Sequence, residues 1–196
     1  MMKRVFDLAV SVVALLLLAP LLILIALLVV AGSPGGAFFR QERVGQNGRT
    51  FRLVKFRTMR PGSEAGGQLT VGTRDPRITG IGRFLRRSKL DELPQFWNVL
   101  IGDMSLVGPR PEVPKYVALY NAEQRQVLRF RPGITGPASI AYIDENELLA
   151  RSAHPERAYV EEIMPAKLDL DLRYTRERTF LGDLRILFAT IGRILR

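Results

Sequence analysis

The stretch LAVSVVALLLLAPLLILIALLVVA, residues 8–31, decides the first question about the fold because it contains no charged residue. Folded as a helix that rises roughly 1.5 Å per residue, it is long enough to cross the ~30 Å hydrocarbon core of a bilayer. It exceeds the apolar part of a signal peptide, which usually runs to about 15 residues. We therefore expect this segment to remain in the mature protein and to enter a membrane.

Pro20 lies in the middle of this stretch and predicts a break at Ala19-Pro20. Proline removes one backbone hydrogen bond, and its ring clashes with the carbonyl of Leu16. A re-entrant helix-break-helix would place both of its ends in the cytoplasm, as the positive-inside rule requires of basic flanks. A kinked transmembrane helix would contain such a proline equally well, so the residues alone leave both interpretations open. The basic flanks are Lys3 and Arg4 before the stretch and Arg40, Arg43, Arg49, Arg52, Lys55, Arg57 and Arg60 after it.

The composition limits the chemistry that the chain can perform. The absence of cysteine excludes disulfides and thiolate catalysis. His154 is the single histidine, so a histidine-rich metal site is excluded and a metal would need carboxylate ligands, which suit magnesium. The formal charge of +10 indicates an anionic partner such as nucleic acid, lipid head groups or a phosphorylated substrate.

The rest of the chain, residues 33–196, reads as one mostly helical domain with a small β-hairpin. The hairpin is predicted from two alternating runs around Gln46-Asn47-Gly48, because Asn-Gly is a strong turn signal. A final amphipathic helix, 180–196, would suit a membrane surface, although packing on the core is the commoner arrangement. The expected elements are strands 38–44 and 50–59, a loop 61–76, helices 81–87 and 93–101, a strand 105–107, a helix 112–130, a loop 131–136 and a helix 155–178.

Asp91-Glu92 is the first candidate for chemistry. Pro94 is tolerated in the first turn of a helix, so the pair should lie at or just before a helix N-terminus. Asp91 could be a cap, but Pro94 has no N–H and only Leu93 could be capped. An ionised carboxylate near a helix start and basic residues could instead attack phosphorus and form an acyl phosphate, while its neighbour acts as a base or holds magnesium. Arg86, Arg87 and Lys89 supply the positive potential.

Three further segments could bind a phosphorylated ligand. Arg110 stands between two prolines and is presented from a stiff turn, where its guanidinium could bind a phosphate or a uracil edge. Lys55 and Arg57 should share one face of a strand and could cradle a phosphate, although a solvated basic face is the commoner explanation. The glycines of 131–136 allow close approach to a ligand, as they would in a plain turn.

Together these segments resemble the monotopic phosphoglycosyl transferases, the bacterial sugar transferase family. The individual motifs are weak, whereas their succession in the family's order is highly specific. The segments that carry the resemblance are 3–7, 19–20, 39–45, 55–59, 90–95, 102–112 and 131–136.

The resemblance implies an α+β fold, mostly helical with a small β-hairpin, and it favours the re-entrant membrane helix over the spanning one. Residues 1–32 would form this helix-break-helix with its break at Ala19-Pro20, and residues 33–196 a cytoplasmic catalytic domain with amphipathic surface helices. The enzyme would lie in the bacterial inner membrane at its cytoplasmic face, in contact with phospholipids. The length fits the small members of the family, and the extra transmembrane helices of larger relatives are not expected.

The resemblance also implies a reaction. A sugar 1-phosphate would pass from a UDP-sugar to polyprenol (undecaprenyl) phosphate, with release of UMP and a phosphosugar-aspartyl intermediate in a ping-pong mechanism. Asp91 would be the nucleophile and a ligand of the required Mg²⁺, Glu92 its catalytic partner, and Arg110 a contact of the nucleotide. The remaining candidates for substrate binding are Lys55, Arg57, Arg86, Pro109, Pro111, Glu112 and Arg131.

One departure from the family pattern affects the substrate site. Many relatives continue the Pro-Gly-Ile-Thr-Gly loop with a stretch like Ala-Gln-Val-Asn-Gly-Arg, whose arginine would lie on the phosphates. This chain has Pro137-Ala138-Ser139-Ile140-Ala141-Tyr142 instead, and Arg131 is our candidate for the replacement.

Two other functions compete with this one. A membrane-tethered nucleic-acid-binding module would explain the charge, but no recognition pattern supports it, so we expect no nucleic acid partner. A non-catalytic membrane scaffold would leave Asp91 without a role. Whether the chain forms a homo-oligomer is left open.

Overall fold

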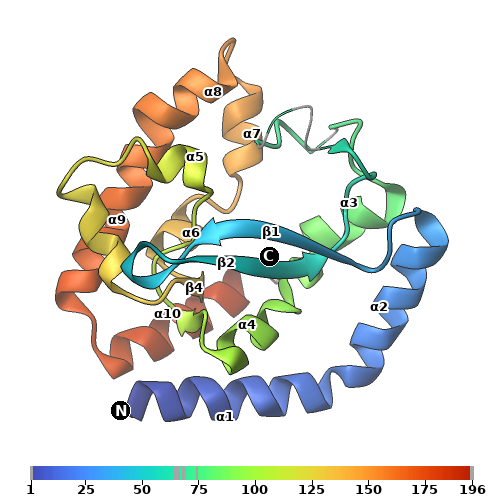
Figure 1. Ribbon diagram of the computed structural model, residues 1–196, viewed down its shortest axis with the longest axis horizontal. Helices are drawn as coiled ribbons and strands as arrows, with labels where there is room; N and C mark the ends of the chain where they lie inside the picture. The colour runs from blue at the N-terminus through green and yellow to red at the C-terminus, as the bar shows by residue number, and fades with distance from the viewer. Residues whose placement is uncertain (1, 64–66, 68, 74, 195–196) are drawn as a thin grey trace.

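The first two helices form a bent pair that runs along one edge of the molecule (Figure 1). The structure is a computed structural model that describes residues 2–63, 67, 69–73 and 75–194. Helices α1 (Met2–Leu17) and α2 (Ala19–Gly32) meet at Leu18 at an angle of 63°, with Pro20 in the first turn of α2. This confirms the predicted break. Of the described residues, no single helix combines the length and apolar character of a membrane span, whereas this bent pair does so jointly.

Helix α1 is bound to the rest of the protein through its charged first turns. The Lys3 ammonium donates to the Val107 carbonyl at 3.1 Å and to an Asp183 carboxylate oxygen at 2.5 Å. Arg4 donates to the Val99 carbonyl at 2.8 Å, and the carboxylate of Asp7 accepts a hydrogen bond from the Ser105 hydroxyl at 2.7 Å. These polar contacts fix the N-terminal end of the bent pair to the domain that follows it, a role that the sequence did not reveal.

Strands β1 (Phe38–Val44) and β2 (Thr50–Phe56) form the predicted antiparallel hairpin, with Phe38 opposite Phe56 and Val44 opposite Thr50. Asn47 has a φ of 59° in the turn, which asparagine tolerates better than most residues. The second strand was predicted to reach residue 59, but it ends at Phe56. Beyond it the chain leaves β1, and Met59 pairs with Ile78 instead.

The centre of the chain contains a second, unpredicted pairing of strands. Strand β3 (Ser105–Val107) was expected, but the loop predicted for 131–136 contains β4 (Gly133–Thr135), which pairs with β3 in parallel. Ahead of β3, helix α3 (Gly80–Arg87) is followed by a 3₁₀ turn, Leu90–Glu92, and by α4 (Gln95–Ile101). The predicted start of α4 at residue 93 was therefore early, because the 3₁₀ turn and Pro94 precede the regular helix.

The long helix predicted for 112–130 was wrong. The segment contains only the short α5 (Pro114–Val117) and a 3₁₀ stretch, Gln124–Arg129. Its beginning is extended because the backbone carbonyl of Glu112 accepts a hydrogen bond from the backbone N–H of Val44 at 2.8 Å. Its middle is interrupted by Asn121 and Gln124, whose side chains bond each other's backbone N–H groups and so compete with helical hydrogen bonds.

The C-terminal third is helical and covers the side of the molecule opposite α2 (Figure 1). The helices after residue 154 were predicted, whereas α6 and α7 were not. The predicted helix 155–178 contains a π-helical stretch, Tyr159–Ile163, at which the chain passes from α8 into α9. On α10, Asp183 is buried while Leu181 and Phe188 are exposed, so this helix packs on the core and also presents an apolar face. The helices are α6 (Pro137–Ala141), α7 (Glu145–Ala150), α8 (Pro155–Ala158), α9 (Met164–Glu177) and α10 (Phe180–Ile194).

The buried apolar residues form three clusters around the site. One lies between the hairpin and α9, around Tyr116 and Tyr159. A second joins α4, β3 and the hairpin around Val99 and Met104, and a third joins α2 to α3 around Phe56. The observed α+β fold is therefore mostly helical with two small sheets, one of which was predicted.

Candidate active site

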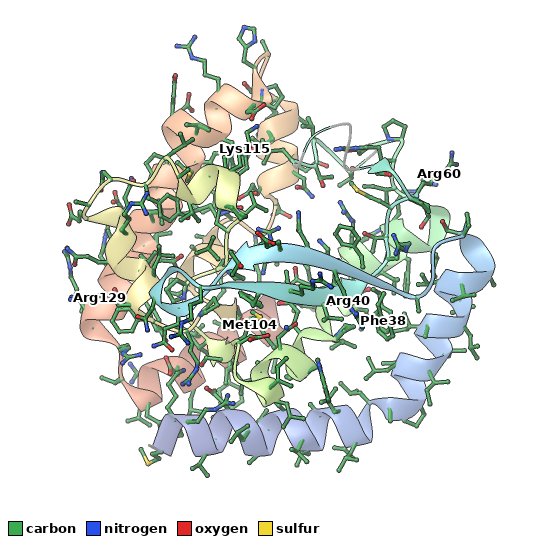
Figure 2. All side chains as sticks on the ribbon, in the orientation of Figure 1. Phe38, Arg40, Arg60, Met104, Lys115 and Arg129 are labelled. Atoms are coloured by element: carbon green, nitrogen blue, oxygen red, sulfur yellow. The ribbon has the colours of Figure 1, made fainter. Side chains whose placement is uncertain are left out.

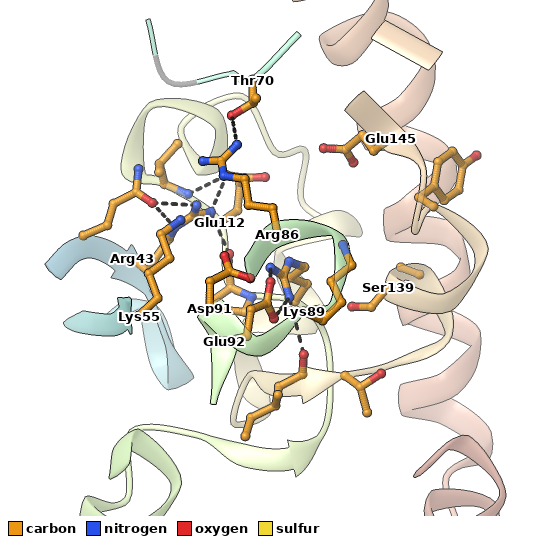
Figure 3. Close-up of a pocket in the computed structure, with 18 of the residues that line it drawn as sticks. Arg43, Lys55, Thr70, Arg86, Lys89, Asp91, Glu92, Glu112, Ser139 and Glu145 are labelled. Carbon is orange, nitrogen blue, oxygen red and sulfur yellow. Dashed lines mark hydrogen bonds and ion pairs between the residues drawn. The ribbon is translucent and has the colours of Figure 1, made fainter. Parts of the chain in front are cut away.

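A cavity of about 1010 Å³ lies between the hairpin, the turn that joins α3 to α4, and the C-terminal helices (Figure 3). Most of the residues predicted for the site line it. Two of the predicted residues, Pro109 and Arg131, are absent from the described lining of the cavity. The predicted residues that do line it are Lys55, Arg57, Arg86, Asp91, Glu92, Arg110, Pro111 and Glu112.

Asp91 lies in the 3₁₀ turn before α4 and is 6% exposed. Its Oδ1 is buried and has no hydrogen-bond partner among the described residues, and neither the 3₁₀ turn nor α4 has a side-chain cap. Capping therefore does not explain this carboxylate. Burial and the neighbouring charge of Glu92 raise the pKa of Asp91 to about 6, against the opposing effect of Lys55. With this pKa the group is still mostly ionised at neutral pH, as the sequence predicted.

Glu92 differs from its neighbour because both of its oxygens are bound. Its Oε1 accepts from Arg110 Nη2 at 2.5 Å, and its Oε2 accepts from Arg110 Nη1 at 3.2 Å (Figure 3). Burial alone would raise the pKa of Glu92, but the charge and hydrogen bonds of Arg110 outweigh it and lower that pKa to about 2. The two adjacent carboxylates thus have opposite environments, one without a partner and one in an ion pair.

Cationic side chains face the dyad from two elements. Lys55, on β2, lies over the Phe39 ring, and burial lowers its pKa to about 8. Arg86, on α3, donates to the hydroxyls of Thr58 at 2.8 Å and Thr70 at 3.1 Å. Because both side chains are already oriented by protein contacts, they can bind phosphate oxygens at a small cost in side-chain entropy.

Arg57 borders the cavity, but its guanidinium donates to the carbonyls of Gly36 at 3.1 Å and Phe38 at 3.0 Å. It also lies over the ring of Phe39, as Lys55 does, so the two basic residues share a face as predicted. The hydrogen bonds to the backbone indicate that Arg57 holds the start of β1 in place.

The turn that carries Arg110 is held by glycine contacts. Gly133 N–H donates to the Pro109 carbonyl at 2.9 Å, and Gly108 N–H donates to the Thr135 carbonyl at 3.0 Å. A Cβ on Gly133 would lie 2.1 Å from the Gly108 nitrogen, so no side chain fits there. The stiffness that the prolines predicted is therefore reinforced by a docked strand, and the glycines of 131–136 serve this packing.

Glu112 lies at another wall of the same cavity and has every oxygen satisfied. Its Oε1 accepts from Arg43 at 3.1 Å and from the backbone N–H of Val113 at 2.7 Å, and its Oε2 accepts the hydroxyl of Tyr159. Arg43 also donates to the Pro111 carbonyl at 3.0 Å. Arg43 and Tyr159 were missed as site residues. Arg43 lies in the segment 39–45 that carries the family resemblance, but nothing in that segment singled it out, and Tyr159 lies in no such segment.

Asp171 on α9 was also missed, because it lies in a helix predicted only as charged. It is 4% exposed and lines the cavity, and its Oδ1 has no partner among the described residues. Burial raises its pKa to about 7, although the backbone N–H groups of Arg110 and Ala138 oppose the shift. Arg131, by contrast, donates to the Gly102 carbonyl at 3.1 Å and does not replace the missing family arginine in the cavity wall.

The dyad suits a magnesium ion that is shared with a substrate. The described residues contain no group of three or more His, Cys, Asp or Glu that could hold a metal. Magnesium, however, is usually bound by one or two carboxylates together with substrate phosphates and water. The buried Oδ1 of Asp91, which has no hydrogen-bond partner in the described parts of the chain, is a suitable ligand of this kind.

Comparison with known proteins identifies the family. A family model described as bacterial sugar transferase matches residues 1–196. The chain is 43% identical to an undecaprenyl-phosphate glucose phosphotransferase of Komagataeibacter xylinus, over 97% of this chain and 35% of that protein. It is 39% identical to the UDP-glucose:undecaprenyl-phosphate glucose-1-phosphate transferase of Escherichia coli (strain K12), over 97% of this chain and 39% of that protein. The chain thus spans well under half of these two relatives.

A relative of similar size also matches. The exopolysaccharide production protein PSS of Rhizobium leguminosarum bv. phaseoli is 39% identical over 97% of this chain and 93% of its own length.

Proposed function

The chain belongs to the bacterial sugar transferase family, and from that premise we propose that it transfers a sugar 1-phosphate from a UDP-sugar to undecaprenyl phosphate and releases UMP. The observation that carries the proposal is Asp91, a buried carboxylate whose Oδ1 has no hydrogen-bond partner among the described residues and which faces Lys55 and Arg86 across a cavity. The printed names of the relatives supply the substrate classes.

In the first half of the proposed reaction, an Asp91 oxygen attacks the β-phosphorus of the UDP-sugar. The new O–P bond forms as the bond from that phosphorus to the bridging oxygen breaks, and UMP leaves with the electron pair. Lys55 and Arg86 would hold the phosphate oxygens and offset the charge that develops there, as preorganised cations do in phosphoryl transfer. The sugar phosphate remains on Asp91 as an acyl phosphate.

In the second half, a phosphate oxygen of the polyprenol phosphate attacks the same phosphorus, and the bond to Asp91 breaks to regenerate the carboxylate. Glu92 would take a proton from this acceptor only after Arg110 has turned away from it, because a carboxylate paired with a guanidinium is a weak base. We propose that Glu92 first holds Arg110 in place and then assists the transfer. A magnesium ion on Asp91 would stabilise charge on the phosphates.

The test of this function separates its two halves. Purified protein is incubated with a panel of radiolabelled UDP-sugars, and UMP release and labelling of the protein are measured before polyprenol phosphate is added. We expect labelled protein with at least one sugar, and loss of the label to lipid on addition of the acceptor. Intact-mass spectrometry of the peptide that contains both carboxylates should place the adduct on Asp91. An adduct on Glu92, or turnover with no adduct under any condition, would contradict the mechanism.

We also propose that α1 and α2 dip into the cytoplasmic leaflet of a bacterial inner membrane and return. Apolar side chains project from both helices away from the body (Figure 2). Both ends of the pair are held by the same domain: Lys3 and Arg4 bind it at one end, and Gly36 accepts from Arg57 just after the other. Because one domain holds both ends of the pair, we expect the two ends to lie on the same side of the bilayer. The exposed apolar residues of the pair include Val5, Val12, Val13, Leu16, Leu17, Ile23, Leu24, Leu27, Leu28 and Val30.

Cysteine labelling in intact cells tests this topology. Single cysteines at positions 2 and 46 should both be protected from a reagent that does not enter the cytoplasm, and both should react after permeabilisation. Labelling of position 2 alone in intact cells would establish a full span and would overturn the re-entrant arrangement.

A further inference from the structure

The cavity that contains Asp91 and Glu92 also has an apolar region, which has no role in the proposed steps of phosphate transfer. Five of its apolar lining residues lie together and come from five different elements. The same five belong to one packed cluster, built on the buried side chains of Leu53, Val99 and Met104. We call this region the apolar floor: Val10 on α1, Phe96 on α4, Leu106 on β3, Ile134 on β4 and Leu187 on α10.

Helix α10 extends the apolar floor toward the surface. Thr190, Ile191 and Ile194 also line the cavity, and their spacing from Leu187 puts them on one face of the helix. Thr190 bonds the hydroxyl of Thr135 at 2.7 Å, which fixes this face against β4. Phe188 is 72% exposed and is absent from the described lining, so a second apolar stripe of α10 points away from the cavity.

The apolar floor lies directly beside the reactive carboxylates. The carbonyl of Ile134 accepts from Arg110 Nη1 at 3.4 Å, and the same nitrogen donates to Glu92. A ligand phosphate at the dyad therefore has cationic side chains on one side and an apolar surface on the other.

We propose that the apolar floor and the lining face of α10 bind the first isoprenoid units of the polyprenol phosphate acceptor. This inference rests on the proposed function. Of the reactants, only the acceptor joins an apolar chain directly to the reacting phosphate, whereas a UDP-sugar is polar along its whole length. The chain must leave the cationic end of the cavity by an apolar route, and burial of apolar area would stabilise it there. Ile191, 54% exposed, marks the point at which this route reaches the surface.

The experiment compares two exposed apolar residues on α10, Ile191 on the lining face and Phe188 on the outward stripe. Ile191→Gln removes apolar surface from the lining face, and Phe188→Gln removes it from the outward stripe. Each variant, in detergent, is first loaded with a radiolabelled UDP-sugar and then chased with undecaprenyl phosphate or with a short analogue of two isoprene units. Leu187→Gln is the second lining variant, closer to the dyad.

We expect Ile191→Gln to load at the normal rate but to transfer to undecaprenyl phosphate roughly ten-fold more slowly at limiting acceptor, as the loss of one buried apolar side chain predicts. Leu187→Gln should lose transfer to both acceptors, because it would contact the units nearest the phosphate. Phe188→Gln should match the unaltered protein in both steps.

Three results would overturn the inference: normal transfer in both lining variants, an equal loss in Phe188→Gln, or a loss in Ile191→Gln that is the same for the short and the long acceptor. Failure of the proposed function would look different, because the unaltered protein would then form no adduct at all.

Discussion

Two carboxylates in one cavity, Asp91 and Glu112, show how the same chemical group serves opposite purposes. Glu112 is bound by Arg43, Tyr159 and the backbone, and it ties the hairpin to the π-helical stretch before α9 and to the Arg110 turn. Asp91 is more deeply buried, and its Oδ1 has no partner among the described residues. Burial without hydrogen bonds destabilises an ionised carboxylate, so Asp91 costs stability in the part of the chain that the structure describes, and its unpaired Oδ1 suits the proposed role of nucleophile. The network of Glu112 instead contributes stability and rigidity.

The largest effect should come from Asp91→Asn, which replaces the proposed nucleophile with a neutral amide of the same size. We expect complete loss of both the adduct and UMP release, measured with a radiolabelled UDP-sugar. The melting temperature should be unchanged or higher. The pKa of Asp91 is higher in the folded protein than in the unfolded chain, so at neutral pH its ionised form lowers the stability of the fold, and the neutral amide removes this cost. A much lower melting temperature in this variant would show that Asp91, like Glu112, has a structural role.

Arg110→Ala should have the next largest effect. The arginine pairs with Glu92, and a charge-assisted hydrogen bond is worth roughly 1.5–3 kcal/mol. We expect kcat/KM for the UDP-sugar to fall roughly ten- to a hundred-fold. Arg131→Ala is the matched control, because Arg131 bonds the Gly102 carbonyl outside the described cavity lining, and it should keep normal kinetics. Equal losses in the two variants would show that general positive charge matters more than the Arg110 turn.

The pH dependence of adduct formation should report the state of Asp91. Its pKa is raised to about 6, so the carboxylate is ionised above this pH and its protonated, unreactive form increases below it. The rate should fall about ten-fold for each pH unit below the midpoint. Because the charge of Glu92 helps to raise the pKa of Asp91, Glu92→Gln should move the midpoint to lower pH and slow turnover, yet leave the adduct detectable. A midpoint unmoved by Glu92→Gln would contradict the coupling.

The smallest effect on rate should come from Glu112→Gln. The amide can keep some hydrogen bonds of the carboxylate but loses the ion pair with Arg43, so we expect the free energy of unfolding to fall by roughly 1.5–3 kcal/mol. Adduct formation at a permissive temperature should change by less than about three-fold, a free-energy change below 1 kcal/mol. Thermal melting and loading assays on one preparation would measure both. Abolished loading with unchanged melting would make Glu112 a member of the reactive group.

The parts of the fold that were predicted correctly have local causes. Pro20 located the break between α1 and α2, and Asn47-Gly48 located the hairpin turn. The dyad was placed before α4 because Pro94 favours a helix start. Signals of this kind depend on a few adjacent residues, and a single sequence contains them.

The parts that were missed depend on residues far apart in the chain. The extended start of the predicted helix 112–130 follows from pairing with Val44, and β4 exists only because β3 lies beside it. The same holds in the site, where Arg43 and Tyr159 meet at Glu112 from opposite ends of the chain. Periodicity cannot report such contacts, because each partner alone looks like an ordinary surface or core residue.

The glycine packing beneath the Arg110 turn has a consequence for the order in which the protein can mature. A Cβ on Gly136 would lie 2.4 Å from the Gly108 carbonyl oxygen, so the backbones of the two segments touch directly. During synthesis the dyad emerges from the ribosome well before residues 133–136, which must dock before Arg110 has a fixed position. A nascent chain of intermediate length therefore carries the proposed nucleophile but lacks the support for the Arg110 guanidinium. Ribosome-bound chains that still hold residues 133–136 inside the exit tunnel should bind nucleotide more weakly than longer chains in which these residues have emerged, and adduct formation should begin only when the two segments have joined.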